Sequence, residues 1–237
     1  MINFNILVVD DEKEICDAIE IYLKREGYGV YKAFDGMEAL EILADNKIHL
    51  ILLDVMMPKL DGIKTCMKIR EDQNIPIIIL SAKSENVDKI IGLNSGADDY
   101  ITKPFNHLEL IARVKSQLRR YEKPLNVENI NVKDKIIIKD LEIDTTRKTV
   151  ALRGEEVKLT ATEYGILLLL ASNPGKVFSI KEIYEKVWKA PFYHSENTVT
   201  VHIRRMREKI EFNPKNPEYI KVVWGVGYKI DDSTYKL

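Results

Sequence analysis

Three acidic residues of this chain follow directly after apolar segments. Asp10 and Asp11 come after the first apolar run, and Asp54 comes after the continuous apolar run 50–53. A run of this kind is typical of a strand that is buried on both faces of a parallel sheet. The carboxyl ends of such strands share one edge, where ligands bind in open α/β folds. A single acid there would more often cap a helix, but three of them predict a cluster of carboxylates.

Two further polar residues are expected at the same edge, because Ser81 and Lys103 end the fourth and fifth apolar stretches. A divalent cation stabilises carboxylates that repel one another, and Mg²⁺ prefers carboxylates, waters and phosphate oxygens. A lysine ammonium and a serine hydroxyl are both suited to phosphoryl oxygens. The set predicts that the Asp54 carboxylate attacks phosphorus to form an aspartyl phosphate, with Mg²⁺ as cofactor. The alternative is a purely structural ion network.

The elements that position these side chains alternate regularly along residues 1–120. Five strand–helix units predict an α/β fold, a doubly wound five-stranded parallel sheet with helices on both faces. The expected strands are 4–9, 28–33, 50–53, 75–80 and 100–102, and the expected helices are 12–26, 36–44, 63–70, 85–94 and one that opens at Lys103 and ends at Arg120.

Residues 1–120 contain the motifs VVDDE, LLDVMMPKLDG, ILSAK and GADDYITKPF. With these motifs they resemble the receiver domain of bacterial response regulators, which has a flavodoxin-like fold. The resemblance implies that Asp54 accepts a phosphoryl group from the phosphohistidine of a sensor histidine kinase. It also implies that Asp10, Asp11, Asp54 and the backbone carbonyl of Met56 hold Mg²⁺.

The same resemblance gives two residues a switching role. Ser81 occupies the Thr/Ser switch position and Tyr100 the aromatic switch position, and Lys103–Pro104 matches a peptide bond that is cis in the family. We expect Ser81 to move toward the phosphoryl group and Tyr100 to follow it, so that the surface formed by residues 85–120 rearranges.

Six charged residues of this surface lie at positions that a subfamily uses for salt bridges between the two chains of a homodimer. Charges on helices are more often solvated surface, and exposed pairs set register more than affinity. The implied pairs are Lys89 with Glu109, Asp99 with Arg113, and Asp98 with Arg120.

Residues 121–134 are polar and lack periodicity, so they are expected to form a linker. The remaining residues, 135–237, predict a small antiparallel sheet, three helices and a hairpin. The capping-box spacing from Thr160 to Glu163 opens the first helix, Ser179 caps the second, and the third runs over 195–211. The strands are expected at 136–138, 141–143, 149–151 and 156–157, and the hairpin at 219–230.

The third helix carries an apolar stripe on one face and cations on the other. Four cations on one helix could form a solvated face, but two short helices, a cationic helix and a hairpin together predict a winged helix-turn-helix that binds double-stranded DNA. Residues 1–120 have a net charge of −4 and residues 121–237 one of +3, which is compatible with this division. The candidate DNA-contacting residues are Asn197, Thr198, Val201, Arg204, Arg205, Arg207 and Lys209.

Residues 135–237 contain the motifs LTATEYGILLLLASNPGKVFS, NTVTVHIRRMREKI and WGVGYKI. These motifs resemble the effector domain of the OmpR/PhoB family, so the chain looks like a regulator of that family throughout. The resemblance implies that residues 189–194 contact RNA polymerase. Many relatives have an arginine at the position of Trp224 that can enter the minor groove, and tryptophan cannot make the same charge-assisted bonds. The last two motifs are similar to the branch that contains vancomycin-resistance regulators. Asn197, Val201 and Arg205 would face bases, and Thr198, Arg204 and Arg207 would face phosphates.

Composition limits the remaining possibilities. The chain is 45% hydrophobic and 31% charged, it has no apolar run of about 18 residues, and its start lacks the zones of a signal peptide. We therefore expect a cytoplasmic protein that does not cross a membrane. Cys16 and Cys66 have no paired spacing, so we expect them to be reduced and buried.

Two other functions remain possible from the sequence. The acidic cluster could belong to a phosphatase or phosphotransferase, but Asp54 is followed by VMMP and lacks a second acid as general acid. The first domain could also be a dimerisation module that works without phosphate. The complete acidic set, with Ser81 and Lys103, argues against that reading.

Overall fold

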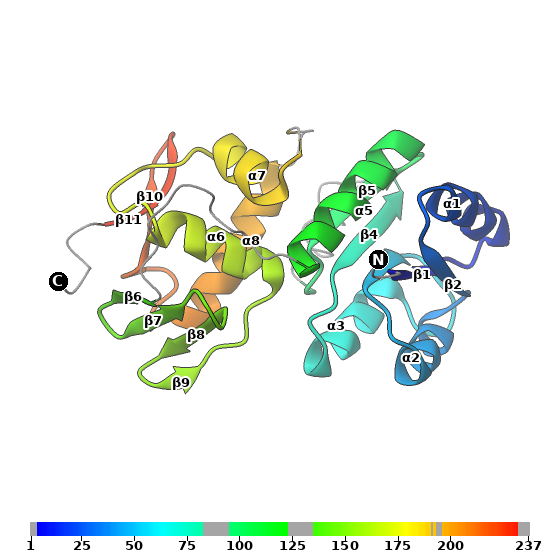
Figure 1. Cartoon of the computed structure of the whole chain (residues 1–237), viewed down its shortest axis with the longest axis horizontal. Helices are drawn as coiled ribbons and strands as arrows, with labels where there is room; N and C mark the ends of the chain where they lie inside the picture. The colour runs from blue at the N-terminus through cyan, green and yellow to red at the C-terminus, as the bar shows by residue number, and fades with distance from the viewer. Residues whose placement is uncertain (1–3, 83–94, 123–134, 191, 193–195, 232–237) are drawn as a thin grey trace. The chain divides into compact units, whose positions relative to one another are not determined.

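We describe residues 4–82, 95–122, 135–190, 192 and 196–231 in a computed structural model of the chain (Figure 1). The chain divides into two compact units, Met1–Glu122 and Lys123–Leu237. The last helix of the first unit ends at Glu122, two residues into the stretch expected to be the linker. Among the helices of the described residues, none has both the length and the apolar character needed to cross a membrane.

The first unit contains the predicted five-stranded parallel sheet, in the order β2-β1-β3-β4-β5. The two central strands β1 and β3 are almost completely buried, which explains their continuous apolar runs. The order of the strands reverses between β1 and β3, which is where open sheets of this type bind ligands. The strands are β1 (Asn5–Val9), β2 (Gly29–Ala33), β3 (Leu50–Asp54), β4 (Ile77–Ala82) and β5 (Asp99–Lys103).

Helices cover both faces of this sheet (Figure 1). Helices α1 and α5 pack together over one apolar core, and α2 packs against α3. Cys16 in α1 and Cys66 in α3 are buried free thiols, as predicted. The expected helix 85–94 lies outside the described residues. The described helices are α1 (Lys13–Arg25), α2 (Gly36–Asp45), α3 (Gly62–Asp72) and α5 (His107–Glu122).

The start of α5 differs from the prediction. Lys103 ends strand β5 instead of opening a helix, and α5 begins at His107. A residue before proline is biased toward extended backbone, so Pro104 keeps Lys103 in the strand. Asn106 then caps the helix, because its Oδ1 accepts the backbone N–H of Leu108 at 2.8 Å.

The second unit has a four-stranded antiparallel sheet, three helices and a hairpin, as predicted. Thr160 with Glu163 and Ser179 with Glu182 both form complete capping boxes. Nearly every residue of α6 is buried, and α6 packs against the other two helices. The elements are β6 (Lys135–Ile138), β7 (Leu141–Asp144), β8 (Thr149–Leu152), β9 (Glu155–Glu156), α6 (Ala161–Ala171), α7 (Ile180–Trp188), α8 (Glu196–Ile210), β10 (Ile220–Val223) and β11 (Gly227–Ile230).

The hairpin is attached to the start of α7. Phe178 and Tyr228 exchange backbone hydrogen bonds of 2.9 Å. A Cβ atom on Gly227 would lie 1.9 Å from the carbonyl oxygen of Phe178. Glycine is therefore required for this close approach of two backbones.

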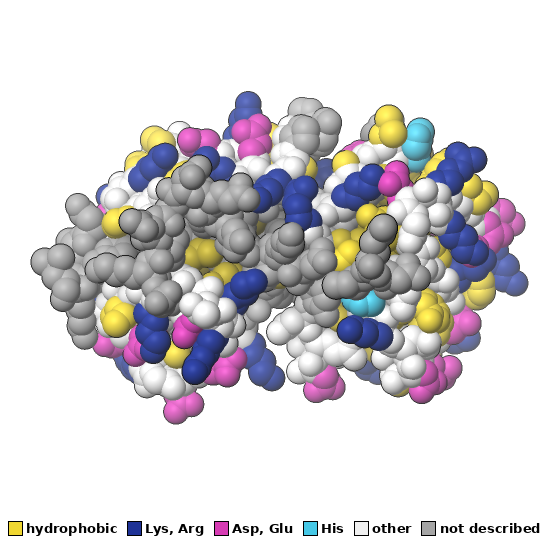
Figure 2. Space-filling model, viewed as in Figure 1, with side chains coloured by type: hydrophobic (Ala, Val, Ile, Leu, Met, Phe, Trp, Pro, Cys, Tyr) yellow, Lys and Arg dark blue, Asp and Glu magenta, His cyan; other side chains and the backbone are white. Residues whose placement is uncertain are grey.

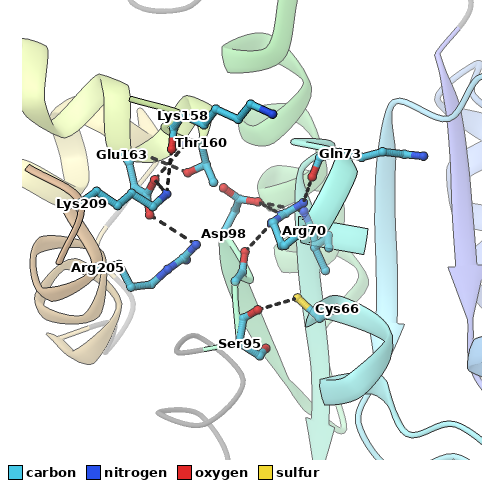
Figure 3. Close-up of polar contacts among 12 residues, drawn as sticks. Cys66, Arg70, Gln73, Ser95, Asp98, Lys158, Thr160, Glu163, Arg205 and Lys209 are labelled. Atoms are coloured by element: carbon cyan, nitrogen blue, oxygen red, sulfur yellow. Dashed lines mark hydrogen bonds and ion pairs between the residues drawn. The ribbon is translucent and has the colours of Figure 1, made fainter. Parts of the chain in front are cut away.

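In the first unit, Arg70 ties the end of α3 to the loops before β4 and β5 (Figure 3). Its guanidinium donates to the carbonyl oxygens of Gly96 at 2.8 Å and Ile75 at 2.7 Å, and to the Asp98 carboxylate at 2.7 Å. Asp98 also accepts the backbone N–H of Ile77 at 3.0 Å. Both charged side chains are largely buried, so each depends on the other for compensation.

We expect Arg70→Ala to loosen β4 and β5, because it leaves the buried Asp98 carboxylate without its cation. Breaking a buried pair on one side typically lowers the free energy of opening by about 3 kcal/mol. Hydrogen–deuterium exchange of the Ile77 amide should then be about a hundredfold faster. Lys24→Ala, which removes an exposed lysine that pairs with Glu20, is the matched control, and equal exchange in both variants would contradict the assignment.

Candidate functional site

The structure brings Asp10, Asp54 and Lys103 together at the carboxyl edge of the sheet. Val9 and Leu53 are paired in the register of β1 and β3, so the acids that follow them lie at adjacent strand ends. The Lys103 ammonium lies 2.6 Å from the Asp10 carboxylate and 2.7 Å from the Asp54 carboxylate. The Lys103–Pro104 peptide bond is cis, as the resemblance implied.

Burial dominates the electrostatics of this cluster. It raises the pKa of Asp54, although Lys103 and the backbone N–H of Met56, at 2.7 Å, oppose the shift. Burial also disfavours the charge on Lys103, but hydrogen bonds to Asp10 and Asp54 outweigh it and raise the lysine pKa. The Asp54 carboxylate is therefore poorly solvated, and a further positive charge beside it would be favourable.

The donors at this edge suit a hard cation. Asp10 is buried, whereas Asp11 follows it at the same strand end and is exposed to solvent. Within the described ranges, no three His, Cys, Asp or Glu side chains are arranged in this structure so that they could hold a metal ion without further ligands. Carboxylate oxygens supplemented by waters are the ligand set that Mg²⁺ accepts, since it keeps much of its hydration. The residues thus fit Mg²⁺ better than a softer metal.

Gly62 is a residue of this site that the sequence indicated only as part of a turn. A Cβ atom at Gly62 would lie 1.9 Å from the Asp54 carbonyl oxygen. The Gly62 amide also donates to the Val55 carbonyl at 3.0 Å. The start of α3 therefore packs directly against the backbone that carries Asp54, which the absence of a side chain permits.

The two expected switch residues are buried on neighbouring strands. Ser81 lies inside β4, one residue before its end, and is paired in register with Thr102. Tyr100 lies on β5, and burial raises the pKa of its hydroxyl. Their movement on phosphorylation stays a prediction.

Four of the expected dimer residues form ion pairs within one chain. Arg113 contacts both oxygens of Asp99, at 2.8 and 3.0 Å, and also pairs with Glu109 at 2.8 Å. Asp98 pairs with Arg70, as described above. Lys89 and the side chain of Arg120 lie outside the described residues. The proposed pairs between chains therefore stay predictions, and they would compete with these intrachain partners.

Helix α8 has the predicted apolar stripe, formed by the buried residues Val199, Ile203, Met206 and Ile210. Thr198 and Val201, two of the candidate DNA contacts, are also buried in the structure. The side chain of Asn197 lies outside the described residues. In the space-filling view of the whole chain in Figure 2, Lys and Arg side chains are interspersed with Asp and Glu side chains over the visible surface.

The four cations of α8 differ in their surroundings. Arg204 is exposed and pairs with Glu208 at 3.1 Å. Arg205 and Lys209 both pair with Glu163 of α6 (Figure 3). Arg207 donates to the carbonyl oxygen of Ile220, at 2.6 Å from Nη2, and lies over the Tyr228 ring. Burial lowers the pKa of Arg207. Its hydrogen bonds to Ile220 join α8 to the hairpin, so a contact with a phosphate would compete with them.

The hairpin places Trp224 at its tip, where the side chain is 87% exposed. In the expected polymerase-contacting loop, Lys189 ends α7 in a left-handed conformation and Phe192 packs edge-on against Tyr184. Residues 191, 193 and 194 of this loop lie outside the described residues.

Comparisons with known proteins assign both units. The family "Response regulator receiver domain" matches residues 6–115, and the family "Transcriptional regulatory protein, C terminal" matches residues 154–230. The chain is 48% identical to "Regulatory protein VanR" of Enterococcus faecium over 95% of this chain and 98% of that protein. It is 44% identical to the uncharacterized transcriptional regulatory protein YcbL of Bacillus subtilis, over 95% of this chain and 100% of that one.

Solved structures agree with this assignment. The response regulator DrrB of Thermotoga maritima, described as an OmpR/PhoB homolog, is 36% identical with a TM-score of 0.50, over 97% of this chain and 100% of that one. A RitR mutant is 27% identical with a TM-score of 0.77, over 97% of this chain and 99% of that one.

We expect Arg207→Ala to destabilise the second unit by about 1–3 kcal/mol, because it leaves the Ile220 carbonyl without its charged donor. Both tryptophans of the chain, Trp188 and Trp224, lie in the second unit, and Trp188 is fully buried. Their fluorescence during urea unfolding therefore reports on that unit. Arg204→Ala is the control and should unfold like the wild type, whereas equal midpoints for the two variants would refute the structural role of Arg207.

Proposed function

Because the chain belongs to the OmpR/PhoB family of response regulators, we propose that a sensor histidine kinase phosphorylates Asp54 and thereby controls DNA binding by the second unit. A two-component regulator with a DNA-binding effector domain needs an acid that can accept a phosphoryl group. The observation that carries the proposal is the contact of Lys103 with both Asp10 and Asp54.

In the proposed reaction, the Asp54 carboxylate attacks the phosphorus of a phosphohistidine. An O–P bond forms, the N–P bond breaks, and the imidazole leaves with a proton from solvent. Lys103 offsets negative charge on the phosphoryl oxygens, and the N–H of Met56 orients the carboxylate. Asp10, Asp11, Asp54 and the Met56 carbonyl would hold Mg²⁺, which supplies further charge stabilisation when bound.

The signal then passes from the phosphoryl group to the surface around β5 and α5. Ser81 moves toward the phosphoryl oxygens, and Tyr100 on the adjacent strand occupies the space that this creates. We propose that Arg113 exchanges its intrachain partners for those of a second chain, so that a homodimer forms. Arg113 and Asp99 are both buried, so the acids of the second chain must replace the intrachain partners with comparable geometry.

The dimer presents two α8 helices to paired half-sites on double-stranded DNA. Asn197, Val201 and Arg205 would face bases, and Thr198 and Arg204 would face phosphates. Thr198 and Val201 are buried in the structure, so their contacts with DNA require that they become exposed. The loop 189–194 would contact RNA polymerase. The protein would act in the cytoplasm, where its kinase and promoter DNA are both accessible.

Asp54→Ala should abolish phosphorylation. Full-length protein incubated with acetyl phosphate and Mg²⁺ should gain the mass of one phosphoryl group, whereas the variant should gain none. Asp45→Ala, which changes an exposed acid at the end of α2, should be labelled like the wild type. Labelling of Asp54→Ala at the wild-type level would reject the assignment of the phosphoacceptor.

The same samples test the coupling to DNA. Genomic fragments captured by the phosphorylated wild type should be retained less well by Asp54→Ala. Equal capture with and without the phosphodonor would instead favour a receiver that dimerises independently of phosphate.

A further inference from the structure

A fully buried carboxylate lies beneath the DNA-contacting helix of the second unit. Glu163 belongs to the first turn of α6 and has no exposed surface. Its Oε2 accepts the backbone N–H of Thr160 at 2.9 Å in the capping box. A single hydrogen bond of this kind does not compensate a buried charge, which costs several kcal/mol unless cations are close.

Two cations from α8 supply that compensation (Figure 3). Lys209 lies 2.7 Å from Oε2 of Glu163, and Arg205 lies 3.3 Å from Oε1. The two residues are four positions apart, so they lie on the same side of the helix one turn apart. Lys209 also donates to the Lys158 carbonyl at 3.0 Å, which fixes its ammonium close to α6.

The carboxylate is charged in this setting. Burial opposes ionisation, but the positive charges of Arg205 and Lys209 outweigh it and hold the pKa of Glu163 below its usual range. Arg205 is only 11% exposed, in contrast to Arg204, which is 67% exposed and whose partner Glu208 is also exposed. An exposed pair dissociates readily in favour of a phosphate, whereas a buried one does so at a substantial loss.

The difference in burial between the Arg205 and Arg204 ion pairs matters, because non-specific DNA affinity depends on how many cations neutralise phosphates. Arg207 is bound to the Ile220 carbonyl, and Arg205 and Lys209 are held by Glu163. Arg204 is therefore the cation of α8 whose partner is most easily exchanged for a phosphate.

We propose that Glu163 determines DNA specificity by withholding Arg205 and Lys209 from phosphates. Arg205 exchanges Glu163 for DNA when a base edge offers two acceptors in the correct geometry, as guanine does for arginine. Contacts with phosphates alone do not replace the buried pair. This inference rests on the proposed contact of α8 with DNA.

The second capping box of the unit provides a matched control. Glu182 occupies the same position relative to Ser179 that Glu163 occupies relative to Thr160. Glutamine is accepted at this position of a capping box, so Glu→Gln preserves the helix start and removes only the charge. Glu182→Gln changes the net charge by the same amount as Glu163→Gln. In the part of α8 whose side chains are described, no residue pairs with Glu182.

The test measures binding of the full-length chain to a short DNA duplex of random sequence at several salt concentrations. Glu163→Gln should bind about tenfold more tightly at low salt, and its slope of log affinity against log salt should steepen by about one to two. Glu182→Gln should resemble the wild type. Equal affinities and slopes for both variants would overturn the inference, whereas the absence of salt-dependent binding by every protein, wild type included, would overturn the proposed DNA contact itself.

A second pair of variants guards against a loss of folding in Glu163→Gln, which tryptophan fluorescence would reveal. Lys209→Met is compared with the double variant Glu163→Gln/Lys209→Met, in which no charge is left uncompensated between these two positions. The double variant should have the steeper salt slope, by about one, because Arg205 has lost Glu163. Identical slopes would overturn the inference independently of the first pair.

Discussion

The energetic penalty for burying a carboxylate is the constraint on which this structure depends. Asp10 and Asp54 end adjacent strands in the centre of a parallel sheet, where little solvent reaches them. Lys103 reaches them from the end of β5 and compensates both charges. The sheet order β2-β1-β3-β4-β5 makes this meeting possible, because it sets β1 beside β3 at the point where the order reverses. Two carboxylates share one lysine at this site, so a further positive charge beside them would be favourable.

The same constraint recurs where the chain must join separate elements. Arg70 compensates Asp98 and thereby attaches α3 to the loops before β4 and β5. Arg113 compensates Asp99 and attaches α5 to β5. In the second unit, Lys209 compensates Glu163 and attaches α8 to α6. Since each buried charge is costly without its partner, breaking any of these contacts on one side is strongly destabilising.

Pairs of this kind occur both in the receiver unit and on α8 of the DNA-binding unit. A regulator must hold its interaction surfaces in reserve until the correct partner is present. Ion pairs within the chain achieve this, because a new partner must replace the existing one with comparable geometry. Arg113 near the receiver surface and Arg205 on α8 are both held in this manner. Specificity then follows from the difference in free energy between binding the new partner and keeping the intrachain one.

The sequence by itself located the described helices and strands, with most of their ends within about two residues of the predicted ones. The apolar runs located β1 and β3, and the spacing of Thr160 and Glu163 located the capping box of α6, because these features depend on residues close together in the chain. Tertiary structure alone decided which charges meet. The same Asp98, Arg113 and Arg205 could face solvent, a second chain or DNA, and their intrachain partners lie up to 42 positions away. It also decided that Gly62 must lack a side chain and that Arg207 is a structural residue. The spacing of residue types along the chain determines which segments form helices and strands. Only the fold determines the distances between side chains on different elements.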